Sequence, residues 1–208
     1  MAEAIGDMAV RSWALAEVYT LGRHGRGEGE AGLRVIPRRG LTIVQVAGYP
    51  EGDAAVCRAI AHCVGTAPAP EPCRGAVAAD GEVAVLWNGP QRYWLVVPEA
   101  RWDPQVLLAK LAAELDLMAA LTDHSQGRVV LRLEGHALEA VLATGSQLDV
   151  HLAAMPAGWC RPTALDGVGC VLHRLDVARA DLYIPRGYAS SFFHWLLDAG
   201  AEFGVELR

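Results

Sequence analysis

Asp123, His124 and Ser125 carry the side-chain types of a hydrolytic triad. Neighbouring residues of an extended segment point to alternate faces, so these three side chains are not expected to line up as a proton relay. The chain also has no G-x-S-x-G turn that would expose a serine nucleophile. We therefore expect this segment to be a turn or cap that leads into a strand over 127–134.

Residues 27–32 match the dinucleotide-binding pattern G-x-G-x-x-G letter for letter. That pattern binds pyrophosphate only between a strand and a helix, because the phosphates rest on the helix N-terminus. Here a charged, glycine-rich tract comes before the pattern and a strand-like segment follows it. The sequence therefore predicts no nucleotide-binding site in this chain.

Histidines and cysteines fall into two loose groups, neither of which has the paired spacing of zinc ligands. The first group is Cys57, His62 and Cys63, and the second is His151, Cys160, Cys170 and His173. The five cysteines of the chain are an odd number and contain no C-x-x-C pair. This usage is typical of reduced, buried thiols in the cytoplasm. We predict no metal site, and a cytoplasmic protein.

The composition restricts the class of protein further. Hydrophobic residues make up 52% of the 208 residues and charged residues 20%, which excludes intrinsic disorder. A net charge of −6 argues against nucleic acid as a partner. No run approaches the roughly 18 apolar residues of a membrane span, and the N-terminus lacks the pattern of a secretory signal. The apolar excess, with six tryptophans, favours a surface buried against a permanent partner.

The loop over 155–163 is a candidate partner contact. It contains two prolines, Trp159 beside Cys160, and Arg161. Exposed tryptophan and arginine are typical of interface hot spots, which favours a ligand loop or a partner anchor. The alternative, of equal weight, is a rigid crossover whose tryptophan covers a sheet edge.

The predicted C-terminal helix over 188–199 is a second candidate. Phe192, Phe193, Trp195 and Leu196 give this helix two apolar sides. We expect one side to pack on a sheet and the other to face a second chain.

The elements that must position these residues occur in the same order in both halves of the chain. In the first half, the pattern predicts strands over 33–37, 41–48, 82–87 and 92–97, a helix over 53–64 capped by Asp53, and a helix from 104 capped by Asp103. In the second half, it predicts strands over 127–135, 169–175, 180–185 and 203–207, with helices over 136–145 and 188–199.

Both halves therefore follow the order β-α-β-β-α with a final strand, which is the ferredoxin-like order. We predict an α+β fold of two intimately packed ferredoxin-like halves with antiparallel sheets. The halves are expected over about 33–120 and 121–208, after a flexible N-terminal segment over 1–32.

Taken together, these segments resemble a known family. The hairpin VLWNGPQRYWLVV resembles the tryptophan–glycine–proline hairpin of the aminomethyltransferase-like superfamily, and the run over 123–204 is similar to the gamma subunit of heterotetrameric sarcosine oxidase. Its specific block is L-D-V-H at 148–151 with P-x-G-W-C at 156–160. Further matching positions are Asp123, Ser125, Gly127, Arg128, Gly135, Gly145, Arg161, Thr163, Leu165, Arg174, Arg186, Tyr188, Ala189, Trp195, Leu196, Glu202, Phe203 and Gly204. The resemblance covers about 33–207.

The resemblance implies the fold of the aminomethyltransferase folate-binding domain and a complex of alpha, beta, gamma and delta chains. That complex oxidatively demethylates sarcosine to glycine, with formaldehyde or methylene-tetrahydrofolate and hydrogen peroxide as the other products. FAD, FMN and NAD then belong to the alpha and beta chains, tetrahydrofolate belongs to alpha, and the gamma chain holds no cofactor.

For this chain the resemblance implies a structural subunit without a catalytic site. The expected partner-interface residues are Trp159, Arg161, Phe192, Phe193 and Trp195. Two alternatives stay open. In the first alternative, the chain is the small subunit of a related N-methyl amino acid dehydrogenase. In the second, it is a stand-alone protein that binds folate or another one-carbon ligand.

Overall fold

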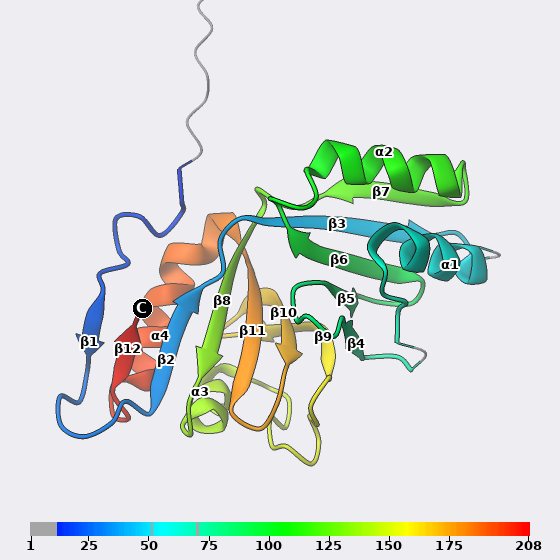
Figure 1. Cartoon of the computed structure of the whole chain (residues 1–208). Helices are drawn as coiled ribbons and strands as arrows, with labels where there is room; N and C mark the ends of the chain where they lie inside the picture. The colour runs from blue at the N-terminus through cyan, green and yellow to red at the C-terminus, as the bar shows by residue number, and fades with distance from the viewer. Residues whose placement is uncertain (1–11, 51, 70) are drawn as a thin grey trace, which may run out of the picture.

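The computed structural model describes residues 12–50, 52–69 and 71–208, which form two β-sheets packed face to face (Figure 1). The smaller sheet contains, in spatial order, β4 (Gly75–Val77), β5 (Ala84–Trp87), β6 (Arg92–Pro98), β3 (Leu41–Gly48) and β7 (Ala119–Asp123). The larger sheet contains β1 (Gly22–His24), β12 (Val205–Leu207), β2 (Leu33–Pro37), β8 (Arg128–Glu134), β11 (Arg179–Pro185), β10 (Val168–Arg174) and β9 (Cys160–Leu165).

Two helices cover the outer face of each sheet, so the molecule has four layers. Helices α1 (Asp53–Val64) and α2 (Pro104–Leu115) pack on the smaller sheet. Helices α3 (Leu138–Gly145) and α4 (Ala189–Gly200) pack on the larger sheet, and α4 follows a short 3₁₀ turn, η1 (Arg186–Tyr188).

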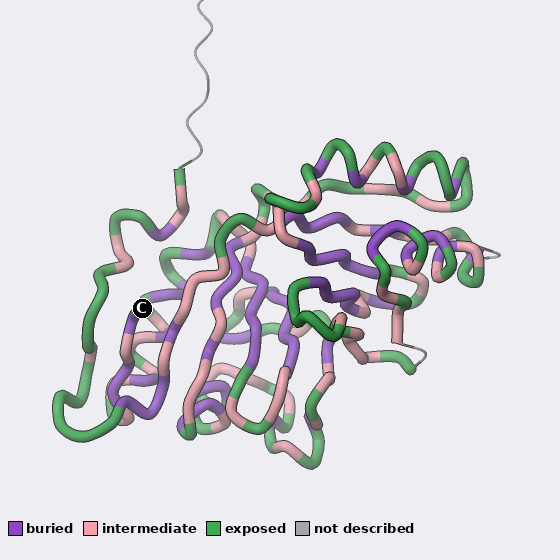
Figure 2. Tube along the Cα trace, in the orientation of Figure 1, coloured by how far each residue is buried: buried purple, intermediate pink, exposed green. Residues whose placement is uncertain are grey.

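Strand residues are therefore buried on both faces of each sheet, as the buried strands in Figure 2 show. In β3, Val44 and Val46 pack against the helices while Ile43 packs between the sheets. Alternating side chains produce this division, and continuous apolar runs such as that of β6 are its sequence signature. Internal burial thus accounts for much of the apolar excess that the composition analysis attributed to a partner.

The ferredoxin-like order is confirmed in both halves. In the smaller sheet, β3-α1-β5-β6-α2-β7 gives the strand order β5-β6-β3-β7. In the larger sheet, β8-α3-β10-β11-α4-β12 gives the corresponding order, but β2 is inserted between β12 and β8. Strand β2 precedes the smaller sheet in the chain yet belongs to the larger one. Its pairing with β12 is parallel, so the larger sheet is not antiparallel throughout.

The segment before residue 33 differs from the flexible segment expected over 1–32. Residues 1–11 lie outside the described residues, but the rest packs on the larger sheet and α4. Leu15 is fully buried, and the Tyr19 hydroxyl donates to the carbonyl oxygens of Val35, at 2.7 Å, and Arg208, at 3.0 Å. Strand β1 pairs with β12. A few apolar side chains anchor a segment whose glycine content suggested mobility.

One of the two expected helix caps is confirmed. The Asp103 carboxylate accepts from the backbone nitrogens of the first turn of α2, and Pro104 occupies the first helical position. Asp53 does not cap α1, whose N-cap is Gly52 without a side-chain hydrogen bond. The Asp53 carboxylate instead accepts from the Tyr93 hydroxyl at 3.1 Å, because β6 brings that hydroxyl beside the helix start.

Three short strands were not expected, namely β1, β4 and β9, whereas β7 is the final strand expected in the first half. Strand β9 begins inside the segment over 155–163 that its prolines marked as a loop. It is the edge strand of the larger sheet, where a proline such as Pro162 leaves no ladder hydrogen bond unmade on its outer side.

Candidate functional site

The Asp-His-Ser segment forms a turn, as the sequence predicts. Ser125 donates from its backbone N and from Oγ to Asp123 Oδ1, at 2.8 and 2.6 Å, and its Oγ accepts from the Ile43 backbone N at 3.0 Å. The Asp123 and Ser125 side chains therefore do meet, because the segment turns and is not extended. His124 lies against the Trp94 ring, with the centroids 5.4 Å apart. The hydroxyl of Ser125 ties two strands together and has no relay behind it.

The loop that carries Trp159 connects the two sheets. On the side of the smaller sheet, Gly75 N donates to Gly158 O at 2.8 Å. On the side of the larger sheet, Gly158 N donates to Arg174 O at 2.7 Å and Arg174 N donates to Trp159 O at 2.8 Å. Hydrogen bonds on both sides fix the backbone of the loop, which agrees with the rigid-crossover alternative.

Trp159 and Arg161 keep access to the surface while belonging to this crossover. Trp159 is half-buried against the core of the larger sheet, and Arg161 is exposed with its guanidinium carbon 5.8 Å from the centroid of the Trp159 ring. A guanidinium stacked on an indole is a preorganised pair of interface type. Both residues stay candidates for partner contact.

Arg174 holds the crossover in place from inside the molecule. It is the largest fully buried side chain among the described residues. Its guanidinium donates to three backbone oxygens, one of which is that of Val150 in the L-D-V-H block, and to the Glu139 carboxylate. Sequence reasoning identified Arg174 only as the end of a strand, because nothing local in a sequence reveals that an arginine is buried.

The candidates on α4 need a correction. Phe192 and Phe193 are completely buried in the core of this chain and cannot reach a partner. The Tyr19 ring stacks on Phe193 with centroids 5.3 Å apart, so the chain's own N-terminal segment covers the side of α4 that was assigned to a second chain. Trp195 is half-buried against Gly145, where an added Cβ would lie 2.5 Å from the indole.

The cysteines are all free, as predicted, and three of the five are buried. Burial raises the pKa of Cys170 to about 12 and raises that of Cys160 further, so neither thiol is a nucleophile near neutral pH. Within the described residues, no group of three or more His, Cys, Asp and Glu side chains is arranged to hold a metal ion.

A polar row crosses the larger sheet on the face that meets the smaller sheet. The strand registers place Cys160, His173, Asp181 and Arg132 side by side. Asp181 is buried and its carboxylate accepts two hydrogen bonds from Arg132, at 2.8 and 2.9 Å, and one from Arg38 at 2.9 Å. Two guanidinium groups thus share one buried carboxylate.

His173, in the same row, is buried and neither of its ring nitrogens has a hydrogen-bond partner in the described part of the chain. Burial lowers the pKa of His173 to about 4, since the charged ring would lose its water. The residue is therefore a neutral packing residue at neutral pH.

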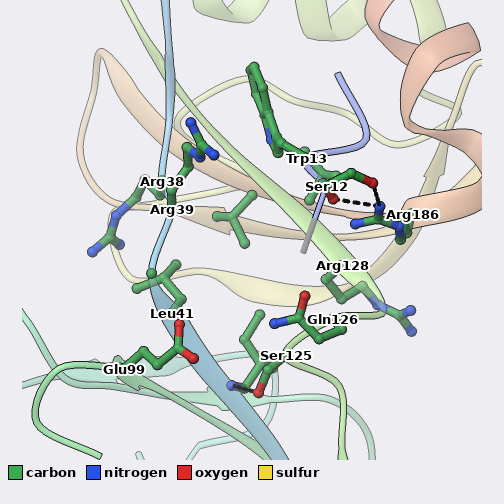
Figure 3. Close-up of a pocket in the computed structure, with 14 residues that line it drawn as sticks. Ser12, Trp13, Arg38, Arg39, Leu41, Glu99, Ser125, Gln126, Arg128 and Arg186 are labelled. Carbon is green, nitrogen blue, oxygen red and sulfur yellow. Dashed lines mark hydrogen bonds between the residues drawn. The ribbon is translucent and has the colours of Figure 1, made fainter. Parts of the chain in front are cut away.

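Four arginines line a cleft of about 210 Å³ where the β2–β3 connection, the β7–β8 loop and the N-terminal segment meet (Figure 3). They are Arg38, Arg39, Arg128 and Arg186. Glu99, Ser125 and Gln126 lie across the cleft from the N-terminal segment.

Most of these guanidinium groups are used by the chain itself. Arg186 Nη2 donates to Ser12 O at 2.6 Å, and the Arg39 guanidinium stacks on Trp13 at 5.1 Å. Together with the Arg38–Asp181 pair, these contacts make the cleft the attachment point of the N-terminal segment. Arg128 extends away from Arg38 and Arg39 in Figure 3.

An apolar patch lies at the end of the smaller sheet. Tyr49, Leu117 and Met118 are 54, 84 and 41% exposed, and Tyr49 N donates to Met118 O at 3.0 Å. Grouped exposed apolar side chains of this kind mark interaction surfaces more often than single ones do. None of the helices in the described residues is long and apolar enough to cross a membrane.

Comparisons with known proteins identify the family to which the chain is similar. The sequence profile of the sarcosine oxidase, gamma subunit family matches residues 51–202. The sarcosine oxidase subunit gamma of Corynebacterium sp. (strain P-1) is 35% identical in an alignment of 155 residues, and the alignment covers 71% of each chain. The sarcosine oxidase subunit gamma of an Arthrobacter species is 32% identical over 146 residues, 70% of each chain.

Solved structures give the same result at the level of the fold. A chain of the heterotetrameric sarcosine oxidase from Corynebacterium sp. U-96 superposes with a TM-score of 0.73 at 26% identity, over 85% of this chain and 87% of that one. The glycine cleavage system aminomethyltransferase T from Bartonella henselae shares the fold, with a TM-score of 0.59 at 16% identity over 86% of this chain and 48% of that one. This chain belongs to the sarcosine oxidase gamma subunit family.

Proposed function

We propose that this chain is the gamma subunit of a sarcosine oxidase-type complex and acts there through its surfaces, without a catalytic site of its own. The observation that carries the proposal is the match to a chain of a heterotetrameric sarcosine oxidase over most of both chains. The partners are then the alpha, beta and delta subunits, and the reaction of the complex is the oxidative demethylation of sarcosine. FAD, FMN, NAD and tetrahydrofolate belong to the partner chains.

Two features of the molecule support a role in assembly. The crossover presents the Trp159–Arg161 pair on a backbone that both sheets hold, so little conformational entropy is lost when a partner binds it. The patch of Tyr49, Leu117 and Met118 leaves apolar surface exposed at the far end of the smaller sheet. We assign both to partner contacts.

The proposal is tested by purifying the tagged full chain from its native host. We expect a yellow complex with three further chains and sarcosine-dependent formation of hydrogen peroxide. If the complex contains flavin but is active only with another N-methyl amino acid, that amino acid and not sarcosine is the substrate. A colourless chain that is purified alone would overturn the proposal.

Substitutions test the two surfaces. Trp159→Ala should weaken association by about 2 kcal/mol, roughly 30-fold, because it removes a central aromatic contact. Sedimentation of the purified complex against a dilution series measures this change. Unchanged dissociation on dilution would remove Trp159 from the interface.

For the apolar patch, Leu117→Asp should release the chain from the complex while its melting temperature is unchanged, because Leu117 is 84% exposed. Val106→Asp on α2 is the matched control, since Val106 is also exposed, at 58%, but lies outside the patch. If both variants assemble equally well, the patch is not a partner contact.

A further inference from the structure

A second cleft, of about 290 Å³, lies between the two sheets beside the β5–β6 hairpin. Arg92 and Trp94 come to it from β6, Arg128 from β8 and Tyr183 from β11. Thr163 of β9 also lines it. Gly169, Cys170 and Val171 of β10 complete the lining, so the cleft is built by five strands of two sheets and is invisible to any local sequence pattern.

The charge of this cleft is positive and uncompensated. Arg92 and Arg128 line it, no aspartate or glutamate does, and neither guanidinium has a carboxylate partner in the described residues. Within the described residues, Arg128 is half-buried, stacks on the Trp94 ring at 5.1 Å and donates only to the adjacent Gly127 O. Burial lowers the pKa of Arg128, which means that its charge has lost hydration without gaining a counter-charge.

Tyr183, which lines the same cleft, has a buried hydroxyl that lacks a partner among the described residues. Tyr183 is completely buried, and its hydroxyl has no hydrogen bond to any of the described residues. Native proteins satisfy nearly all buried polar groups, and an exception is a reason to look for a bound group. Tyr183, Arg92 and Arg128 line one cleft, and none of the three side chains pairs with a carboxylate of the described residues.

We propose that this cleft binds a small organic carboxylate. Arg128 and Arg92 provide the positive charge, since guanidinium and carboxylate match in geometry, and the Tyr183 hydroxyl donates a further hydrogen bond. Trp94 and Val171 supply apolar walls for the carbon skeleton. Binding of a small carboxylate to the free chain does not depend on the assembly of the chain with its partners.

Benzoate is the probe, and benzamide is the control of the same shape without charge. Calorimetric titration of the full chain should show binding of benzoate that is at least about tenfold tighter than that of benzamide. Arg128→Gln should weaken benzoate by about tenfold or more, while Arg101→Gln, an exposed arginine outside the cleft, should leave it unchanged.

Two further variants keep both arginines. Gly169 lines the cleft, and a Cβ added to it meets no atom within 4 Å, so Gly169→Ile should fold normally and block benzoate by filling the space. Tyr183→Phe should raise the melting temperature of the ligand-free chain, because a buried hydroxyl without a partner is removed, and should weaken benzoate.

The same titration on the purified complex identifies the source of the carboxylate. Binding to the complex as well as to the free chain indicates a diffusible ligand, and binding to the free chain alone indicates a side chain of a partner subunit. The proposal is overturned if benzoate gives no heat, if benzamide binds as well as benzoate, or if Arg128→Gln and Gly169→Ile bind like the unaltered chain.

Discussion

Arg174→Met should lower the free energy of unfolding by about 3–5 kcal/mol, the cost of breaking a buried, fully paired charge. Arg174 is completely buried. Its Nε donates to Asp176 O at 2.9 Å and its Nη1 to Val150 O at 3.0 Å, while Nη2 donates to Val177 O at 2.7 Å and to Glu139 Oε1 at 2.8 Å. Methionine fills part of the space but leaves three carbonyl oxygens and one carboxylate without their donor.

Urea denaturation at pH 7 measures this change. Arg179→Met is the matched control, because Arg179 pairs with Asp176 on the surface and is 50% exposed; we expect a loss of at most about 1 kcal/mol. If the two variants lose similar stability, Arg174 does not hold the fold together. The Arg174 variant should also assemble poorly, because the backbone of Arg174 pairs with the loop that carries Trp159.

The second large effect is a loss of stability in acid. The folded chain should lose about 3 kcal/mol between pH 7 and pH 4 through His173 alone. Burial lowers the pKa of His173 to about 4 in the folded state, whereas the unfolded state titrates near the ordinary value of 6.5. Below pH 6.5 the unfolded state therefore binds a proton that the folded state does not, and stability falls as the pH falls until about pH 4.

The groups that face His173 do not reverse this sign. The Asp181 carboxylate raises the pKa of His173. Arg132 and Arg38 pair with that carboxylate, and their positive charges lower the pKa of His173. Denaturation curves at several pH values, compared between the unaltered chain and His173→Leu, isolate the contribution of this residue. Identical pH profiles for the two proteins would contradict a buried, neutral His173.

The His173→Leu variant also tests how this side chain packs. His173 Nε2 lies 2.7 Å from the position that a Cβ on Gly75 would take, so the ring packs directly on the backbone of the smaller sheet. Leucine has no polar atom to leave unsatisfied at this contact, and its cost at neutral pH should therefore be small.

The family and the order of elements follow from the sequence. The L-D-V-H and P-x-G-W-C blocks and the Trp-Asn-Gly-Pro hairpin identify the relatives, and the 3.6-residue and two-residue periods identify the helices and most strands. Asp103 with Pro104 identifies a helix start correctly, because both signals act within the first turn of the same helix. These features are local, so residues close in the chain determine them.

Only the tertiary structure shows which distant segments of the chain contact one another. The insertion of β2 between β12 and β8, the stacking of Tyr19 on Phe193, and the hydrogen bond of Asp53 to Tyr93 each depend on a partner far away in the chain. The same holds for Arg174, because the neighbouring sequence does not distinguish a buried arginine from an exposed one. The period of apolar residues indicates which side of a helix or strand is buried, but not which segment covers that side. Long-range packing determines the covering segment.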